Sequence, residues 1–99
     1  MLNIEFKKDA TKAEVALQGR LDTMTAPQLE EQVKAGLDGV TALTFDFKDL
    51  EYISSAGLRV ILATQKIMNK QGTMVIKNVS EAVNEIFEVT GFSDILTIE

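Results

Sequence analysis

The sequence contains no cysteine and no histidine. Without cysteine there is no disulfide bond and no thiolate chemistry, which fits a cytosolic protein. Without histidine the usual Ser-His nucleophile is excluded, and zinc or iron would be left with carboxylate ligands alone. We therefore expect no transition-metal site, no cofactor and no catalytic centre of the common serine-hydrolase type.

Positive charge and long apolar runs are also scarce. The 99 residues carry 10 basic and 15 acidic side chains, a net charge of −5, whereas nucleic-acid affinity comes mostly from basic groups that meet phosphates. No apolar run approaches the ~20 residues of a membrane span, and residues 1–8 lack the layout of a signal peptide. We expect a cytoplasmic protein that contacts neither nucleic acid nor membrane directly.

The first part of the chain has the pattern of a hairpin followed by a helix. Residues 2–7 and 13–17 alternate apolar and polar side chains, which predicts two half-buried strands in an antiparallel hairpin. Thr25 is the expected N-cap of the first helix, with Gln28 reciprocating as in a capping box. Gly39 is the expected end of that helix.

The rest of the chain alternates strands with helices. Strand patterns at residues 41–47 and 73–77 are each followed by a helix, the first over about residues 56–70 and the second capped by Ser80 and closed by Thr90-Gly91. The apolar residues 95–98 are expected to form a last strand or a packed tail. Strands and helices in this order imply parallel βαβ units.

These patterns predict an α/β fold. The sheet should be mixed, with the N-terminal hairpin followed by parallel βαβ units and with helices packed against it. No linker, internal repeat or low-complexity segment divides the chain. We therefore expect a single domain over residues 1–99.

Two serines mark the centre of the chain. Ser54 and Ser55 lie between a strand that ends at Ile53 and a helix whose apolar spacing begins at Leu58. Side-chain oxygens in this position cap the free N–H groups of a helix, so a purely structural role is one interpretation. A serine in a strand-turn-helix corner is also the geometry of a hydrolase nucleophile, but without histidine it would need a lysine base.

Two motifs give the chain a resemblance to a known family. Residues 50–58, Leu-Glu-Tyr-Ile-Ser-Ser-Ala-Gly-Leu, resemble the signature of the STAS family, the anti-sigma factor antagonists of bacteria. Residues 19–22, Gly-Arg-Leu-Asp, are similar to the family's Gly-x-Leu-Asp segment, which lies near the serine corner in that fold. The likeness extends over essentially the whole chain and implies the STAS fold.

The resemblance implies a regulatory binding protein that is not an enzyme. Its partner would be an anti-sigma factor that is also a serine kinase. The unphosphorylated form would bind this partner and release a sigma factor, and phosphorylation of a serine at the helix N-terminus would switch it off. A serine phosphatase would be a further partner.

The alignment on Gly57-Leu58 carries the phosphoacceptor onto Ser55, with Ser54 as the alternative. The partner-binding residues implied by the resemblance are Asp22, Ser54, Ser55, Ala56, Gly57, Leu58, Arg59 and Leu62. Gly57 is expected to let a partner approach closely, because it has no side chain. Leu58 and Leu62 are interpreted either as core or as an exposed contact. Asp22 is interpreted either as a turn carboxylate or as a group that orders the corner or contacts the kinase.

Two other functions remain open from the sequence. The chain could be an accessory subunit of another assembly, such as a lipid-transporting ABC system or a stress-signalling complex, with the corner as an unmodified docking surface. It could also be a serine hydrolase that uses Lys48 or Lys66 as the base. The acidic segment after Lys77 is interpreted as a solvated face that repels other acidic proteins.

Overall fold

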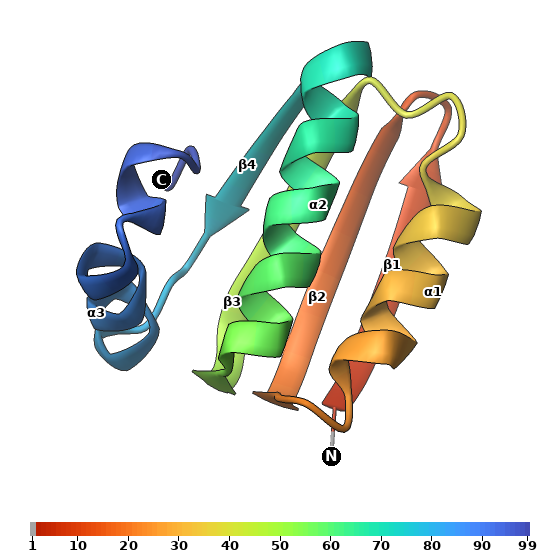
Figure 1. Cartoon of the computed structure of the whole chain (residues 1–99). Helices are drawn as coiled ribbons and strands as arrows, with labels where there is room; N and C mark the ends of the chain where they lie inside the picture. Colours follow the sequence, from red (N-terminus) through yellow and green to blue (C-terminus); the bar gives the residue numbers. More distant parts are fainter. Residues whose placement is uncertain (1) are drawn as a thin grey trace.

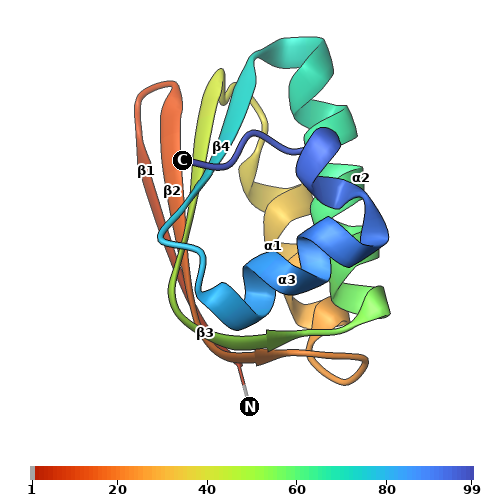
Figure 2. The same ribbon diagram turned by 90° about the vertical axis from the view of Figure 1, so that its left-hand side faces the viewer.

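The computed structural model describes residues 2–99 as a four-stranded sheet with helices along one side of it (Figures 1 and 2). The elements in chain order are β1 (Leu2–Asp9), β2 (Lys12–Leu21), α1 (Ala26–Gly36), β3 (Ala42–Ile53), α2 (Ser55–Gln71), β4 (Thr73–Lys77), α3 (Glu81–Thr90) and the 3-10 turn η1 (Phe92–Asp94).

The strands lie in the order β1-β2-β3-β4. β1 and β2 form the predicted antiparallel hairpin, in which Leu2 is opposite Gly19. β2 pairs with β3 in parallel and β3 pairs with β4 in parallel, so the predicted mixed sheet is confirmed. Since parallel strands end at the same edge of a sheet, Leu21 at the end of β2 lies opposite Ile53 at the end of β3.

The core lies between the sheet and the helices. The apolar residues of the strands alternate inward as the period of two predicts, except after Phe47 in β3, where the buried residues Leu50 and Ile53 are three positions apart. Phe47 is at the centre, with ring centroids 5.7 Å from Phe45 and 6.3 Å from Phe87. The buried apolar face of α2 presents Ile61 and Met68, both 0 % exposed, to this core.

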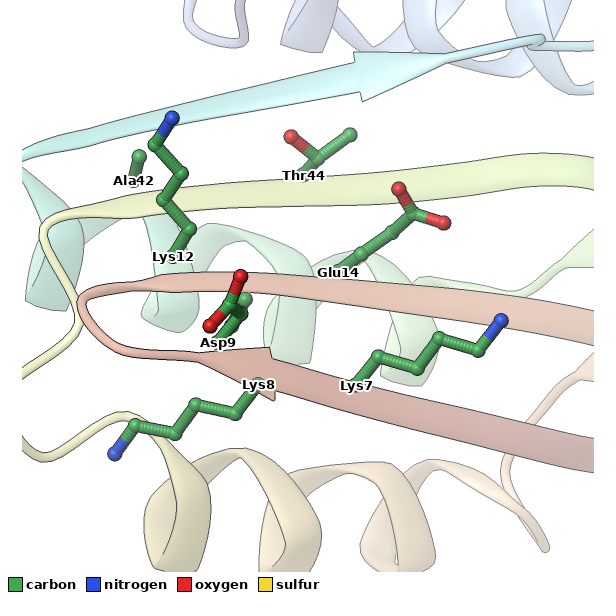
Figure 3. Close-up of a pocket in the computed structure, with 8 residues that line it drawn as sticks. Lys7, Lys8, Asp9, Lys12, Glu14, Ala42 and Thr44 are labelled. Atoms are coloured by element: carbon green, nitrogen blue, oxygen red, sulfur yellow. The ribbon is translucent and has the colours of Figure 1, made fainter.

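The other face of the sheet is polar. A shallow depression of about 470 Å³ lies on it at the hairpin end of the sheet. Figure 3 shows the residues that line this depression. Its charged residues are Lys7, Lys8, Asp9, Lys12 and Glu14, which mix both signs. The Lys8 ammonium is engaged within the protein, because it donates a hydrogen bond to the carbonyl of Asp38 at 2.8 Å.

The expected capping box at Thr25 is wrong. Thr25 precedes α1, but its side chain makes no capping hydrogen bond to that helix. Its hydroxyl instead donates to the Arg20 carbonyl at 2.8 Å and accepts the N–H of Asp22 at 2.9 Å. The Thr25 hydroxyl therefore stabilises the tight turn between β2 and α1 and does not cap the helix.

The expected end of the first helix at Gly39 is also wrong. α1 ends at Gly36, where Leu37 turns into the core and is 3 % exposed. The N–H of Val40 then donates to the Leu37 carbonyl at 3.1 Å, which closes a turn. Gly39 lies inside that turn with a φ of +79°, a conformation that suits glycine.

The last helix has both predicted ends. The Ser80 hydroxyl accepts the N–H of Val83 at 3.2 Å, and Gly91 adopts the left-handed conformation after Thr90. The final residues form a packed tail with one isolated parallel bridge between Ile76 and Ile98. No helix within residues 2–99 combines the length and the apolar character needed to cross a membrane.

Candidate functional site

The serine corner forms where β3 ends and α2 begins, next to the end of β2. The backbone N–H of Ser54 donates to the carbonyl of Leu21 at 2.8 Å. This hydrogen bond continues the parallel pairing of Leu21 with Ile53 by one further residue. Asp22, which follows Leu21, is thereby brought close to the two serines.

The two serines have different surroundings. Ser54 is half-buried and is the N-cap of α2, and its hydroxyl accepts the N–H of Gly57 at 3.2 Å. Ser55 is the first residue of α2 and is exposed. Within residues 2–99, no side-chain hydrogen bond engages the Ser55 hydroxyl. The cap is therefore made by Ser54, and the hydroxyl of Ser55 is open to solvent.

The interpretation of Gly57 as an opening for a partner is wrong. Gly57 is buried, and a Cβ at this position would lie 2.7 Å from the Cγ of Leu21. It would also lie 3.0 Å from the Cγ1 of Ile53 and from the carbonyl oxygen of Leu21. The absence of a side chain therefore allows α2 to pack closely against the end of β2 inside the protein.

Leu58 belongs to the core, so its predicted part in partner binding is wrong. It is 5 % exposed because it follows Gly57 on the inward side of α2. Leu62, one turn further on, is half-buried, and Ala56 is half-buried as well. Arg59 is exposed and is four residues after Ser55, so the two side chains share one face of the helix.

Asp22 shapes the turn before α1. Its carboxylate accepts the N–H groups of Met24 and Thr25 at 3.0 and 3.1 Å. Desolvation tends to raise the pKa of the Asp22 carboxyl, but these hydrogen bonds and the Arg20 guanidinium outweigh it and hold the pKa below its usual value. Asp22 is therefore ionised at neutral pH and acts as the turn carboxylate.

Three exposed residues beside the corner were not predicted from the sequence. Met24 is 87 % exposed in the turn that Asp22 holds. The guanidinium of Arg20 lies over the ring of Tyr52, 4.4 Å from its centroid, and Tyr52 is 37 % exposed. The arginine side chain also lies 4.0 Å from the Asp22 carboxylate. The signal for Met24 was its apolar side chain among polar turn residues, whereas the Arg20–Tyr52 pair depends on the strand register.

The surface around the two serines therefore combines the exposed Ser55 hydroxyl with side chains that proteins favour for recognition. Arg20 lies beside Asp22 and Tyr52, and Arg59 lies one turn after Ser55 on the exposed side of α2. Arginine, tyrosine and methionine are enriched in protein–protein interfaces. These side chains and the exposed hydroxyl are typical of a protein-binding surface.

The model of the STAS domain matches residues 2–99, and the chain belongs to the STAS domain family. The anti-sigma-B factor antagonist of Bacillus subtilis (strain 168) is 32% identical over 98 residues, which cover 98% of this chain and 90% of that protein. The family resemblance drawn from the two sequence motifs is confirmed.

Solved structures have the same fold. An anti-sigma factor antagonist from Mycobacterium paratuberculosis is similar with a TM-score of 0.88 and 23% identity, over 99% of this chain and 85% of that one. The anti-sigma factor antagonist SpoIIAA is similar in its unphosphorylated form, with a TM-score of 0.78 and 17% identity over 98% of this chain and 87% of that one. Its phosphorylated form has a TM-score of 0.77 and 17% identity, over 98% of this chain and 91% of that one. These likenesses show that the chain has the fold of solved proteins that are named anti-sigma factor antagonists.

The packing of Gly57 gives a first prediction. Gly57→Ala should lower the free energy of unfolding by about 1–3 kcal/mol, because the added methyl group overpacks the contact with Leu21. Helix propensity alone predicts the opposite sign, a gain of about 1 kcal/mol. Urea unfolding followed by circular dichroism measures the difference, with Ala63→Gly on the exposed side of α2 reporting the size of the propensity effect. A Gly57→Ala protein as stable as the wild type would contradict the packing argument.

Proposed function

We propose that this chain is an anti-sigma factor antagonist that is controlled by phosphorylation of Ser55. Residues 1–99 form a single STAS domain in this proposal. Its unphosphorylated form binds an anti-sigma factor with serine-kinase activity and so releases a sigma factor, and a serine phosphatase restores it. The single observation that carries the proposal is the exposed Ser55 hydroxyl at the start of α2, free of the capping bond that Ser54 makes.

A phosphate on Ser55 is compatible with the free, folded chain. The first N–H groups of a helix and its positive dipole end attract an anion, an effect of about 0.3–1 kcal/mol at an exposed site. The capping bond stays intact, because it uses the hydroxyl of Ser54. Arg59, on the same face of α2, adds a positive charge one turn away. The modified chain should therefore keep its fold.

The same phosphate is unfavourable in a complex that covers the corner. It adds about −1.5 to −2 charges to a region that already holds the ionised Asp22 and the exposed Glu51. At an interface the charge must lose its water opposite a surface that fits the neutral hydroxyl, which costs several kcal/mol. This cost exceeds the small stabilisation at the helix end, so phosphorylation controls binding more than folding.

The binding surface extends from Ser55 to the turn between β2 and α1. The Asp22 carboxylate holds the backbone N–H of Met24 and so fixes where its apolar side chain leaves the turn, and the Arg20 guanidinium lies over the Tyr52 ring. The Arg20–Tyr52 pair is already in contact before binding, so it loses less conformational entropy as an anchor. We include Met24, Arg20 and Tyr52 in the partner surface, and we leave out the buried Gly57 and Leu58.

The proposal includes no catalysis. Hydrolytic use of Ser55 would need a base within hydrogen-bond reach of its hydroxyl, and the contacts of residues 2–99 include none. Lys48 and Lys66 are both exposed. In this proposal the chain acts in the cytoplasm, the location that the sequence leads us to expect.

Phosphorylation itself gives the second prediction. Incubation with ATP and a cognate anti-sigma factor kinase should add one phosphate to a peptide that contains Ser55, detected by mass spectrometry. Ser55→Ala should stay unmodified, whereas Ser54→Ala should still accept the phosphate. Modification of Ser54 would overturn the choice between the serines. A wild-type chain that several such kinases leave unmodified would favour the accessory-subunit function, in which the corner docks without modification.

The third prediction concerns the switch. Ser55→Asp should weaken binding to the anti-sigma factor about 100-fold or more, which is about 3 kcal/mol, because the new charge must be desolvated in the complex. Ser55→Ala should bind without being switched off by the kinase. Isothermal titration calorimetry measures both affinities, and the melting temperatures of both variants should stay close to that of the wild type. Equal affinities of Ser55→Asp and the wild type would show the charge argument to be wrong.

The fourth prediction concerns Met24. Met24→Ala should weaken binding of the same partner about tenfold, because it removes an exposed apolar anchor. Met24→Leu, which keeps the apolar volume, should bind within about threefold of the wild type. The fold should be unaffected, since the side chain is 87 % exposed. If both variants bind like the wild type, the partner does not contact this turn.

A further inference from the structure

An exposed apolar surface lies on the outer face of α3. A shallow groove of about 270 Å³ is lined by Ala82, Glu85, Ile86, Val89 and Thr90. These residues recur three and four positions apart, so they form one stripe along the helix. Val89 is 87 % exposed, and Ile95, in the segment after η1, is 52 % exposed. We refer to this stripe as the α3 groove.

The exposed residues of the α3 groove lie outside the core, whereas Ile86 is half-buried and packs against it. The inward side of the same helix is occupied by Val83 and Phe87, which are both 0 % exposed. A helix with one buried face is stable when its opposite face is polar. Packing of the core therefore does not explain the exposed apolar residues Ala82 and Val89 on the outward side.

The charged residues of α3 and of the segment after it are all acidic. Residues 78–99 contain no lysine or arginine, and their acidic residues are Glu81, Glu85, Glu88, Asp94 and Glu99. None of these carboxylates has a salt-bridge partner among residues 2–99. An exposed apolar stripe beside unpaired carboxylates attracts a ligand that is both apolar and positively charged.

We propose that the α3 groove binds a basic amphipathic helix of a partner protein. The apolar residues of such a helix would cover Ile86 and Val89, and its lysines or arginines would face Glu85 and the neighbouring carboxylates. Nucleic acids and anionic membranes carry the wrong charge for this surface. A second copy of the chain would bring a like net charge of −5.

This interaction is separate from the function proposed for Ser55. Figure 1 shows α3 on one side of α2 and the turn that leads into α1 on the other. The α3 groove and Ser55 belong to different helices, and Ser55 does not line the groove. Binding at the α3 groove should therefore be independent of the state of Ser55.

The test uses a defined probe and the full chain. The probe is a fluorescein-labelled peptide of leucine and lysine, about 18 residues long and with leucine at helical spacing, compared with a scrambled peptide of the same composition. Fluorescence anisotropy should show the amphipathic peptide binding at least about tenfold more tightly than the scrambled one. Val89→Gln should weaken that binding about tenfold, and Glu85→Gln should reduce its dependence on salt.

Matched controls separate this inference from the proposed function. Ser55→Asp should bind the probe with the same affinity as the wild type, and the melting temperature of Val89→Gln should match that of the wild type. Amide chemical shifts in NMR spectra should change in α3 and in residues 92–96. Equal binding of the scrambled peptide, unchanged binding to Val89→Gln, or shifts centred on the serine corner would overturn the proposal. Concentration-dependent shifts without the peptide would overturn it in favour of a second copy of the chain.

Discussion

The parallel pairing of β2 with β3 is the constraint on which the site depends. Its last hydrogen bond, from the Ser54 N–H to the Leu21 carbonyl, joins two segments that are distant in the sequence. Gly57 allows α2 to follow this pairing at close range, because a larger residue would collide with Leu21. The cap, the Asp22 turn and the Arg20–Tyr52 contact all lie within a few residues of that bond. A change in the register of β2 against β3 would separate them.

The two adjacent serines separate folding from regulation. An N-cap side chain contributes about 1 kcal/mol to a helix, so a regulatory modification of the capping oxygen itself would also affect stability. Here the cap is the hydroxyl of Ser54, which is half-buried and engaged with Gly57. The exposed hydroxyl of Ser55 does not cap the helix. A chemical change at Ser55 can therefore act on a partner at little cost to the fold.

Local patterns in the sequence predicted the strands, the later helices and the cap at Ser80, because period and capping depend on neighbouring residues. The errors at Thr25, Gly57 and Leu58 have a different origin. Thr25 bonds to Arg20 and Asp22, and Gly57 packs against Leu21, so each outcome depends on tertiary contacts that no local pattern contains. The proximity of Asp22 to the corner was expected only through the family resemblance. The pairing of Arg20 with Tyr52 required the register itself.

The charge distribution gives the two surfaces different sensitivities to a phosphate. The corner already holds the ionised Asp22, and an anion of about −1.5 to −2 charges at Ser55 changes the local balance of charge. The α3 groove is built from another helix and has its own acidic residues, of which Glu85 lines it. A phosphate at Ser55 therefore acts on the groups that a partner presents to the start of α2, whereas a partner on α3 contacts other residues. This division would let one small domain be switched at one surface without leaving its assembly.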